Sequence, residues 1–177
     1  LVLMETPSTD PASQLPIRDR LKAEFEEIDY RVVLIPGRET GGHVYATPRY
    51  RNQQQPAQLM LGHCDTVWPI GTLRSMPLIS NGETLRGPGI YDMKAGLVEM
   101  IYALRAITAL GLKPSVVPLC FINSDEEIGS FESTRYVRAL AQRVDRCMVM
   151  EPSLGVSGKL KTARKGVGRF TVTVQGK

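Results

Sequence analysis

Long hydrophobic runs are missing from this sequence, and so is a strong excess of charge. No stretch approaches the roughly 18 consecutive apolar residues of a membrane-spanning helix, so we expect no membrane partner. The net charge of +4 is small and the basic residues are dispersed, which argues against a nucleic-acid partner. The densest basic stretch, GKLKTARKGVGRF at 158–170, alternates with small and apolar residues and predicts a solvated strand face.

Cysteine and histidine are also scarce. The three cysteines, Cys64, Cys120 and Cys147, are odd in number and far apart, which favours buried free thiols in a reducing compartment over a disulfide framework. The first residues, LVLMETPSTD, show no basic start and no long apolar segment, so they do not resemble a secretory signal. We therefore expect a cytoplasmic protein. The alternative is a periplasmic protein whose signal peptide was trimmed, because the chain starts at Leu1 and not at Met.

Helix-like and strand-like segments alternate over the first 150 residues. Helical spacing of apolar residues predicts helices at 16–28, 93–111 and 130–142, and short apolar runs predict strands at 30–35, 43–50, 57–62, 115–123 and 146–150. Pro118 suggests that its strand is an edge or contains a bulge. The alternation predicts an α/β fold, a three-layer sandwich with a mostly parallel central sheet and flanking helices. The last segment, KLKTARKGVGRFTVTVQGK, is expected to form two strands joined by a glycine turn, beyond a boundary near residue 160.

Three of these strand segments lead into residues that bind metal ions. QLMLG is followed by His63, PLCFIN by Glu126 and Glu127, and RCMVM by Glu151. Asp92 lies in a glycine-rich loop that opens a helix. In open α/β sheets, ligands bind beyond the carboxyl ends of the strands. One imidazole and several carboxylates at such an edge suit zinc or a similar divalent ion.

The number of carboxylates predicts more than one cation, because like charges at short range oppose ionisation. Two metal ions that share a bridging carboxylate would relieve the repulsion and lower the pKa of a bridging water. Asp65 would lie on the same side as His63 if the strand geometry continues, and could accept the other ring N–H. Of the adjacent Glu126 and Glu127, one could ligate metal while the other acts as general base on the metal-bound water.

Each of these residues also has an ordinary structural interpretation. Taken alone, His63 would be a core histidine, Asp92 a helix N-cap and the pair 126–127 a solvated turn, so the combination carries the hypothesis. Nucleotide binding is disfavoured, because GPGIYDMKAG lacks the required glycine spacing and Leu160 stands where a Walker loop needs Ser or Thr. A nucleophilic Cys64 is disfavoured because adjacent strand residues point to opposite faces.

Four motifs occur in order along the chain: LGHCDTVWPIGTL, LRGPGIYDMKAG, FINSDEEIGS and MEPS. Together they resemble the co-catalytic zinc amidohydrolases, which include bacterial glutamate carboxypeptidase, acetylornithine deacetylase, succinyl-diaminopimelate desuccinylase and the aminoacylases. The first two motifs are most similar to the glutamate carboxypeptidase branch. The resemblance covers essentially the whole chain. It implies a zinc-exopeptidase-like fold, with residues 1–160 as the N-terminal part of the catalytic domain and 161–177 as the truncated beginning of an inserted lid domain.

The resemblance implies a set of metal ligands and a cofactor. His63 and Glu151 would ligate the first zinc, Glu127 the second, and Asp92 would bridge them. A complete site would hold two Zn²⁺ ions, with Co²⁺ or Mn²⁺ as possible substitutes. The family also places a cis peptide bond after the bridging aspartate, here between Asp92 and Met93.

The implied catalytic residues are Glu126 and Asp65. Glu126 would activate the bridging water and pass its proton to the leaving amine, while Asp65 would orient the metal-binding histidine. The family's second histidine ligand, its lid histidine and its substrate-binding arginine have no counterpart here, and His43 matches no ligand position. We expect zinc-dependent hydrolysis of an amide or peptide bond next to a free carboxylate, in a small N-acyl amino acid or short peptide.

The missing parts limit what the chain itself should do. The full-length enzyme is expected to form a homodimer through the lid, whereas the 177-residue chain alone should have little or no activity. The alternative is a non-catalytic fragment that binds metal or a partner.

Overall fold

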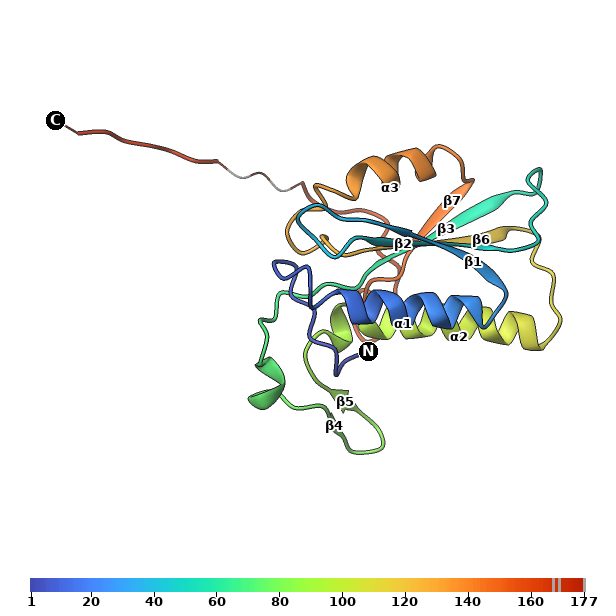
Figure 1. The fold of residues 1–177 in the computed structure, drawn as a ribbon, viewed down its shortest axis with the longest axis horizontal. Helices are drawn as coiled ribbons and strands as arrows, with labels where there is room; N and C mark the ends of the chain where they lie inside the picture. Colours follow the sequence, from blue (N-terminus) through green and yellow to red (C-terminus); the bar gives the residue numbers. More distant parts are fainter. Residues whose placement is uncertain (167, 169, 177) are drawn as a thin grey trace.

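A mixed sheet of five strands lies at the centre of the molecule (Figure 1). The computed structural model describes residues 1–166, 168 and 170–176. The strands are β1 (Tyr30–Ile35), β2 (His43–Pro48), β3 (Ala57–His63), β6 (Val117–Asn123) and β7 (Arg146–Val149), in the order β1-β2-β6-β3-β7. Strand β2 is antiparallel to both of its neighbours, β1 and β6, whereas β6, β3 and β7 run parallel to one another. The expected α/β class with a mostly parallel sheet is therefore confirmed.

Helices cover both faces of the sheet. Helices α1 (Leu15–Glu26) and α2 (Ala95–Ala109) lie on one face and α3 (Thr134–Ala141) on the other, which gives three layers (Figure 1). The inward positions of α1 and α2 follow helical spacing and are buried: Ile17, Leu21, Phe25, Leu97, Ile101 and Leu104. Their contacts with the sheet form the larger core, so the apolar periodicity of the sequence fixes which side of each helix faces inward.

Two expectations about individual strands are wrong. Pro118 lies in the central strand β6 and not at an edge. Val117 N–H donates to the carbonyl of Pro56, on the β3 side of β6. The nitrogen of Pro118 therefore faces the β2 side. Proline is tolerated there because β2 pairs with β6 only from Cys120 to Ile122. Cys147 is exposed, because β7 is the edge strand, whereas Cys64 and Cys120 are buried free thiols as expected.

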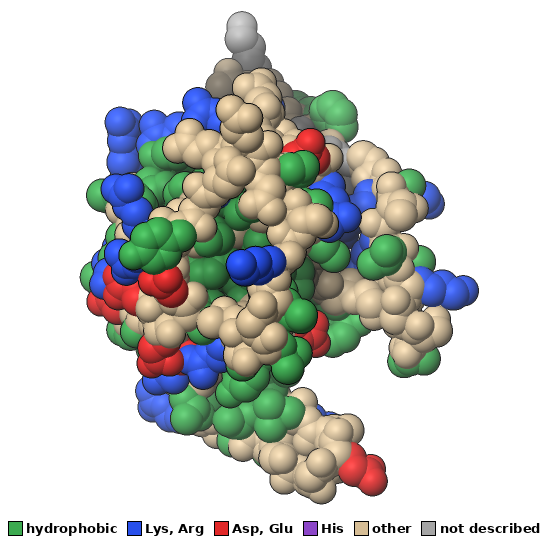
Figure 2. All heavy atoms as spheres, turned by 90° about the vertical axis from the view of Figure 1, so that its right-hand side faces the viewer, with side chains coloured by type: hydrophobic (Ala, Val, Ile, Leu, Met, Phe, Trp, Pro, Cys, Tyr) green, Lys and Arg blue, Asp and Glu red, His purple; other side chains and the backbone are tan. Residues whose placement is uncertain are grey.

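A hairpin and the last residues lie outside the sandwich. The hairpin of β4 (Ile79–Ser80) and β5 (Leu85–Arg86) projects from the body (Figures 1 and 2). The two strands expected after residue 158 are not found among the described residues up to 176, whose last part runs away from the body (Figure 1). A strand needs a neighbour to complete its hydrogen bonds, and the five-stranded sheet does not supply one here. Part of this expectation, at Val167, Arg169 and Lys177, lies outside the described residues.

The surface mixes side chains of all kinds. On the face seen in Figure 2, lysine and arginine side chains are scattered among apolar and acidic ones. Within the described ranges, every helix is too short or too polar to cross a membrane.

Helix α2 meets the end of β7 at a close main-chain contact. A Cβ atom placed on Gly96 would lie 1.9 Å from the carbonyl oxygen of Met150, so glycine alone fits at this position. Met150 N–H also donates to the carbonyl of Leu61 at 2.8 Å, which ties the segment after β7 to β3. This contact brings the helix that follows Asp92 against the segment that leads into Glu151.

Candidate metal centre

The ends of three parallel strands bring the expected site residues together. His63 is the last residue of β3 and pairs with Asn123, the last residue of β6. The turn that carries Glu126 and Glu127 follows β6 directly, and Glu151 lies two residues after β7. The sheet therefore delivers these side chains to one edge, as the strand-end pattern of the sequence predicts.

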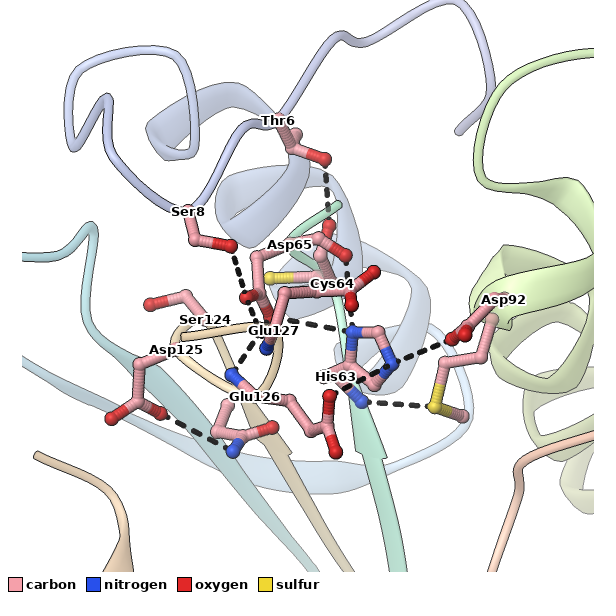
Figure 3. Close-up of polar contacts among 12 residues, drawn as sticks. Thr6, Ser8, His63, Cys64, Asp65, Asp92, Ser124, Asp125, Glu126 and Glu127 are labelled. Carbon is pink, nitrogen blue, oxygen red and sulfur yellow. Dashed lines mark hydrogen bonds and ion pairs between the residues drawn. The ribbon is translucent and has the colours of Figure 1, made fainter. Parts of the chain in front are cut away.

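The imidazole of His63 lies at the centre of this edge (Figure 3). Its side chain is 1% exposed, and Nε2 is 2.9 Å from Asp92 Oδ1 and 3.3 Å from Glu151 Oε1. Potential ligand atoms of His63, Asp92 and Glu151 all lie within 4.8 Å of one another. Glu126 Oε2 is farther, at 4.0 Å from Nε2.

Glu127 is not part of this close group. Among the described residues, only His63, Asp92 and Glu151 form a set of potential ligands at such short mutual distances. Glu127 is half-buried on the same turn as Glu126. The peptide bond between Asp92 and Met93 is cis, as the sequence motif implies.

The second ring nitrogen of His63 faces Asp65. Nδ1 is 3.0 Å from the main-chain carbonyl oxygen of Asp65 and 3.3 Å from its carboxylate Oδ1. Asp65 therefore contacts the imidazole as expected, but the nearer acceptor is its carbonyl and not its carboxylate. Either acceptor leaves Nε2 free to face the carboxylates of Asp92 and Glu151.

The Asp65 carboxylate has further contacts that the sequence did not reveal. It is fully buried and accepts the Ser8 hydroxyl at 2.6 Å and the main-chain N–H groups of Glu126 and Glu127 at 3.3 and 3.2 Å. One buried carboxylate thus contacts both the imidazole of His63 and the turn of the acidic pair (Figure 3). Ser8 precedes Asp65 by 57 residues, and no spacing or periodicity signals their contact.

The crowded carboxylates shift several pKa values. Burial alone would lower the pKa of His63, but hydrogen bonds with Asp65 and Glu151 raise it to about 11. The hydrogen bond between Glu151 and His63 lowers the pKa of Glu151. Partial burial and the nearby carboxylate of Asp92 raise the pKa of Glu127 to about 7, and burial likewise raises the pKa of Glu126.

These donors fit a divalent cation. Nε2 of His63 faces two carboxylates within 3.3 Å but carries at most one proton to share between them. A divalent ion can accept the imidazole and both carboxylates at once and offsets their mutual repulsion. One nitrogen and several oxygen donors are typical of zinc and of similar first-row ions.

We expect the affinity of the chain for Zn²⁺ to rise with pH. His63 without metal keeps its proton until its pKa of about 11, and an ion that binds Nε2 must displace this proton. The apparent dissociation constant should fall about tenfold per pH unit near neutrality. Calorimetry in buffers of different ionisation enthalpy should detect about one proton released per ion. An affinity independent of pH would show that no proton has to leave His63 when the ion binds, which contradicts either its raised pKa or its role as a ligand.

A cavity of about 340 Å³ opens beside the metal edge. His63, Glu126 and Glu151 contribute to its lining, together with Arg138 of α3 and Arg164 from the segment after β7. The cavity therefore places cationic and apolar side chains next to the carboxylates, in a space that a small organic molecule could enter.

A mostly parallel sheet that ends in one histidine and a group of carboxylates is typical of α/β proteins that hold a divalent ion at the carboxyl edge. The chain belongs to the peptidase family M20/M25/M40, whose profile matches residues 59–175. This membership confirms the resemblance found in the four sequence motifs.

Individual relatives agree with this assignment. The chain is 27% identical to carboxypeptidase G2 of Pseudomonas sp. (strain RS-16) over its whole length, which covers 43% of that protein. It is 32% identical to succinyl-diaminopimelate desuccinylase of Alkalilimnicola ehrlichii over 71% of the chain and 36% of that protein. The chain thus spans less than half the length of these relatives.

Solved structures show the same fold. Human carnosine dipeptidase 1 superposes with a TM-score of 0.72 at 18% identity, over 86% of this chain and 37% of that chain. The metallo-carboxypeptidase Sso-CP2 of Sulfolobus solfataricus gives a TM-score of 0.69 at 15% identity, over 89% of this chain and 37% of that chain.

Proposed function

We propose that this chain is part of a zinc-dependent hydrolase that cleaves an amide or peptide bond next to a free carboxylate. The observation that carries the proposal is the convergence of His63, Asp92 and Glu151 within 4.8 Å, with Glu126 beside them. The relatives named carboxypeptidase and desuccinylase support a substrate of this kind. A small N-acyl amino acid or a short peptide is the proposed substrate.

His63, Asp92 and Glu151 would hold one Zn²⁺, and Asp92 would be shared with a second ion held by Glu127. A bound zinc ion lowers the pKa of water and polarises a carbonyl group. Co²⁺ or Mn²⁺ could substitute for zinc because they accept the same donors.

The chain's own residues would handle the proton and the orientation of the site. Glu126 is proposed to take a proton from the attacking water on its carboxylate and to give it to the leaving amine. Its raised pKa suits both steps, since partial burial favours the protonated form that must follow the first transfer. Asp65 would keep the His63 ring turned toward the metal.

The remaining proposals concern the whole protein. Residues 1–160 would belong to the catalytic domain and 161–177 would begin a lid through which two copies dimerise. The free cysteines support a cytoplasmic location. The 177-residue chain is expected to hydrolyse slowly or not at all, because the second ion would have only Asp92 and Glu127 as ligands and the chain covers 43% of carboxypeptidase G2.

Zinc binding and hydrolysis should be measured on the chain as it stands. We expect one tightly bound Zn²⁺ per chain and little release of amine from a panel of N-acyl amino acids and dipeptides. No binding of zinc would contradict the proposed metal centre. Turnover comparable to that of intact relatives would instead show that the 177 residues form a complete site.

A non-catalytic fragment that binds metal is the second candidate. The single group of three close donors among the described residues favours it, because one metal site does not provide the double clamp of co-catalytic hydrolases. Zinc binding without hydrolysis, in a protein of the relatives' length as well as in this chain, would support this candidate.

A further inference from the structure

We propose that Ser8 is a positioning residue of the metal centre, which acts on His63 through the carboxylate of Asp65. The inference rests on the proposed function, since it has meaning only if His63 binds a metal ion. Ser8 does not touch the metal ligands themselves. Its role would be to limit the orientations of the carboxylate that contacts the imidazole.

The contact between Ser8 and Asp65 is short and shielded from water. Ser8 Oγ donates to Asp65 Oδ2 at 2.6 Å, and the two residues are 3% and 0% exposed. Hydrogen bonds from a hydroxyl to a carboxylate at this distance are among the stronger ones in proteins. Loss of the donor from a buried carboxylate is costly, because the acceptor has already given up its contacts with solvent.

Main-chain bonds hold Ser8 in place independently of its hydroxyl. Residues 6–8 run alongside residues 64–66, with a parallel bridge between Pro7 and Thr66. Thr66 N–H donates to the carbonyl of Thr6 at 2.8 Å, and Ser8 N–H donates to the carbonyl of Thr66 at 3.2 Å. Removing the hydroxyl should therefore delete one contact while the segment keeps its position.

Without that hydroxyl, the Asp65 carboxylate would lose its shortest contact. The remaining main-chain donors, Glu126 N–H and Glu127 N–H, are longer at 3.3 and 3.2 Å. The carboxylate would be freer to turn, and its contact with His63 Nδ1 would weaken. Mutation of a residue that directly supports a metal ligand typically lowers metal affinity about 10- to 100-fold. Ser8 is one contact farther from the ion, so we expect its mutation to lower the affinity about three- to tenfold.

The test compares Ser8→Ala with a matched control, Thr6→Val. Thr6 lies in the same segment, is also buried, and donates its hydroxyl to the main-chain carbonyl of Cys64 at 2.7 Å. Both variants lose one buried hydroxyl hydrogen bond, but only Ser8→Ala loses one to Asp65. Zn²⁺ affinity by calorimetry, the visible spectrum of bound Co²⁺ and the thermal unfolding midpoint should be measured on the chain and both variants.

We expect both variants to unfold at lower temperature, and only Ser8→Ala to bind Zn²⁺ about three- to tenfold more weakly with a changed Co²⁺ spectrum. Ser8→Thr, which keeps the hydroxyl, should bind Zn²⁺ with the affinity of the unchanged chain. Equal affinities of Ser8→Ala and the unchanged chain, or equal losses in Ser8→Ala and Thr6→Val, would overturn the role of Ser8. Failure of the unchanged chain to bind zinc would instead overturn the proposed function.

A second variant covers the case in which Ser8→Ala does not fold. Ser8→Cys fills the space of the hydroxyl with a slightly larger thiol, which is only a weak hydrogen-bond donor. It should show the same loss of affinity and the same spectral change while circular dichroism reports a folded chain. Unchanged affinity in a folded Ser8→Cys chain would contradict the proposal.

Discussion

Replacing Glu126 with Gln in any hydrolytically active form of the protein should lower kcat by about a thousandfold and leave the bound metal in place. Gln has the shape of Glu but cannot accept a proton. Glu126 Oε2 is 4.0 Å from His63 Nε2, beside the close donor group but not among its members, so its loss should spare metal binding. The measurements are kcat on an N-acyl amino acid or dipeptide and metal content by elemental analysis.

A matched control is Glu83→Gln, because Glu83 is an exposed glutamate on the β4–β5 hairpin. This variant should keep both activity and metal. Near-normal activity of Glu126→Gln would mean that another group accepts the proton. Loss of metal from Glu126→Gln would assign this residue to the ligands instead.

Replacing Asp65 with Ala should both weaken zinc binding, by about 10- to 100-fold, and destabilise the chain by about 3 to 5 kcal/mol. The carboxylate is fully buried, contacts His63 and accepts the Ser8 hydroxyl. Its removal leaves that hydroxyl and two main-chain N–H groups without their acceptor. Calorimetric titration with Zn²⁺ and denaturant unfolding of the metal-free chain measure the two effects separately.

Asp125 provides the matched control for this experiment. It is also fully buried and accepts two main-chain N–H groups, those of Glu132 and Ser133 just before α3. Asp125→Ala should therefore destabilise the chain by a similar amount, about 3 kcal/mol, while zinc affinity changes less than that of Asp65→Ala. Equal losses of affinity in the two variants would show that Asp65 acts on the metal only through general stability.

Much of the fold could be predicted because its signals are local. The helical spacing of Ile17, Leu21 and Phe25 identifies the buried side of α1, and the run that ends at His63 identifies a buried strand. The place of β6 in the sheet could not be predicted from Pro118, because pairing partners are set by contacts between distant segments. The exposure of Cys147 has the same origin, since only the strand order makes β7 an edge.

The candidate site was predictable to the extent that strand ends determine it. His63 ends one parallel strand and Glu151 comes soon after another, so the α/β pattern predicts that they meet. The proximity of Asp92 was implied by the motif resemblance and is found at 2.9 Å from His63. The contact between Ser8 and Asp65 depends on loop conformation, which leaves no periodic trace in the sequence.

The glycine contact between α2 and the segment after β7 has a consequence for the mechanics of the metal edge. Because Gly96 has no side chain, the main chain of α2 packs closely against the main chain at Met150, which sets the approach of the helix after Asp92 to the segment that leads into Glu151. Glu126 and Glu127, in contrast, are carried on a turn that hydrogen bonds attach to Asp65. Two kinds of contact therefore position the carboxylates at this edge: close main-chain packing on the side of Asp92 and Glu151, and hydrogen bonds to a buried side chain on the side of Glu126 and Glu127.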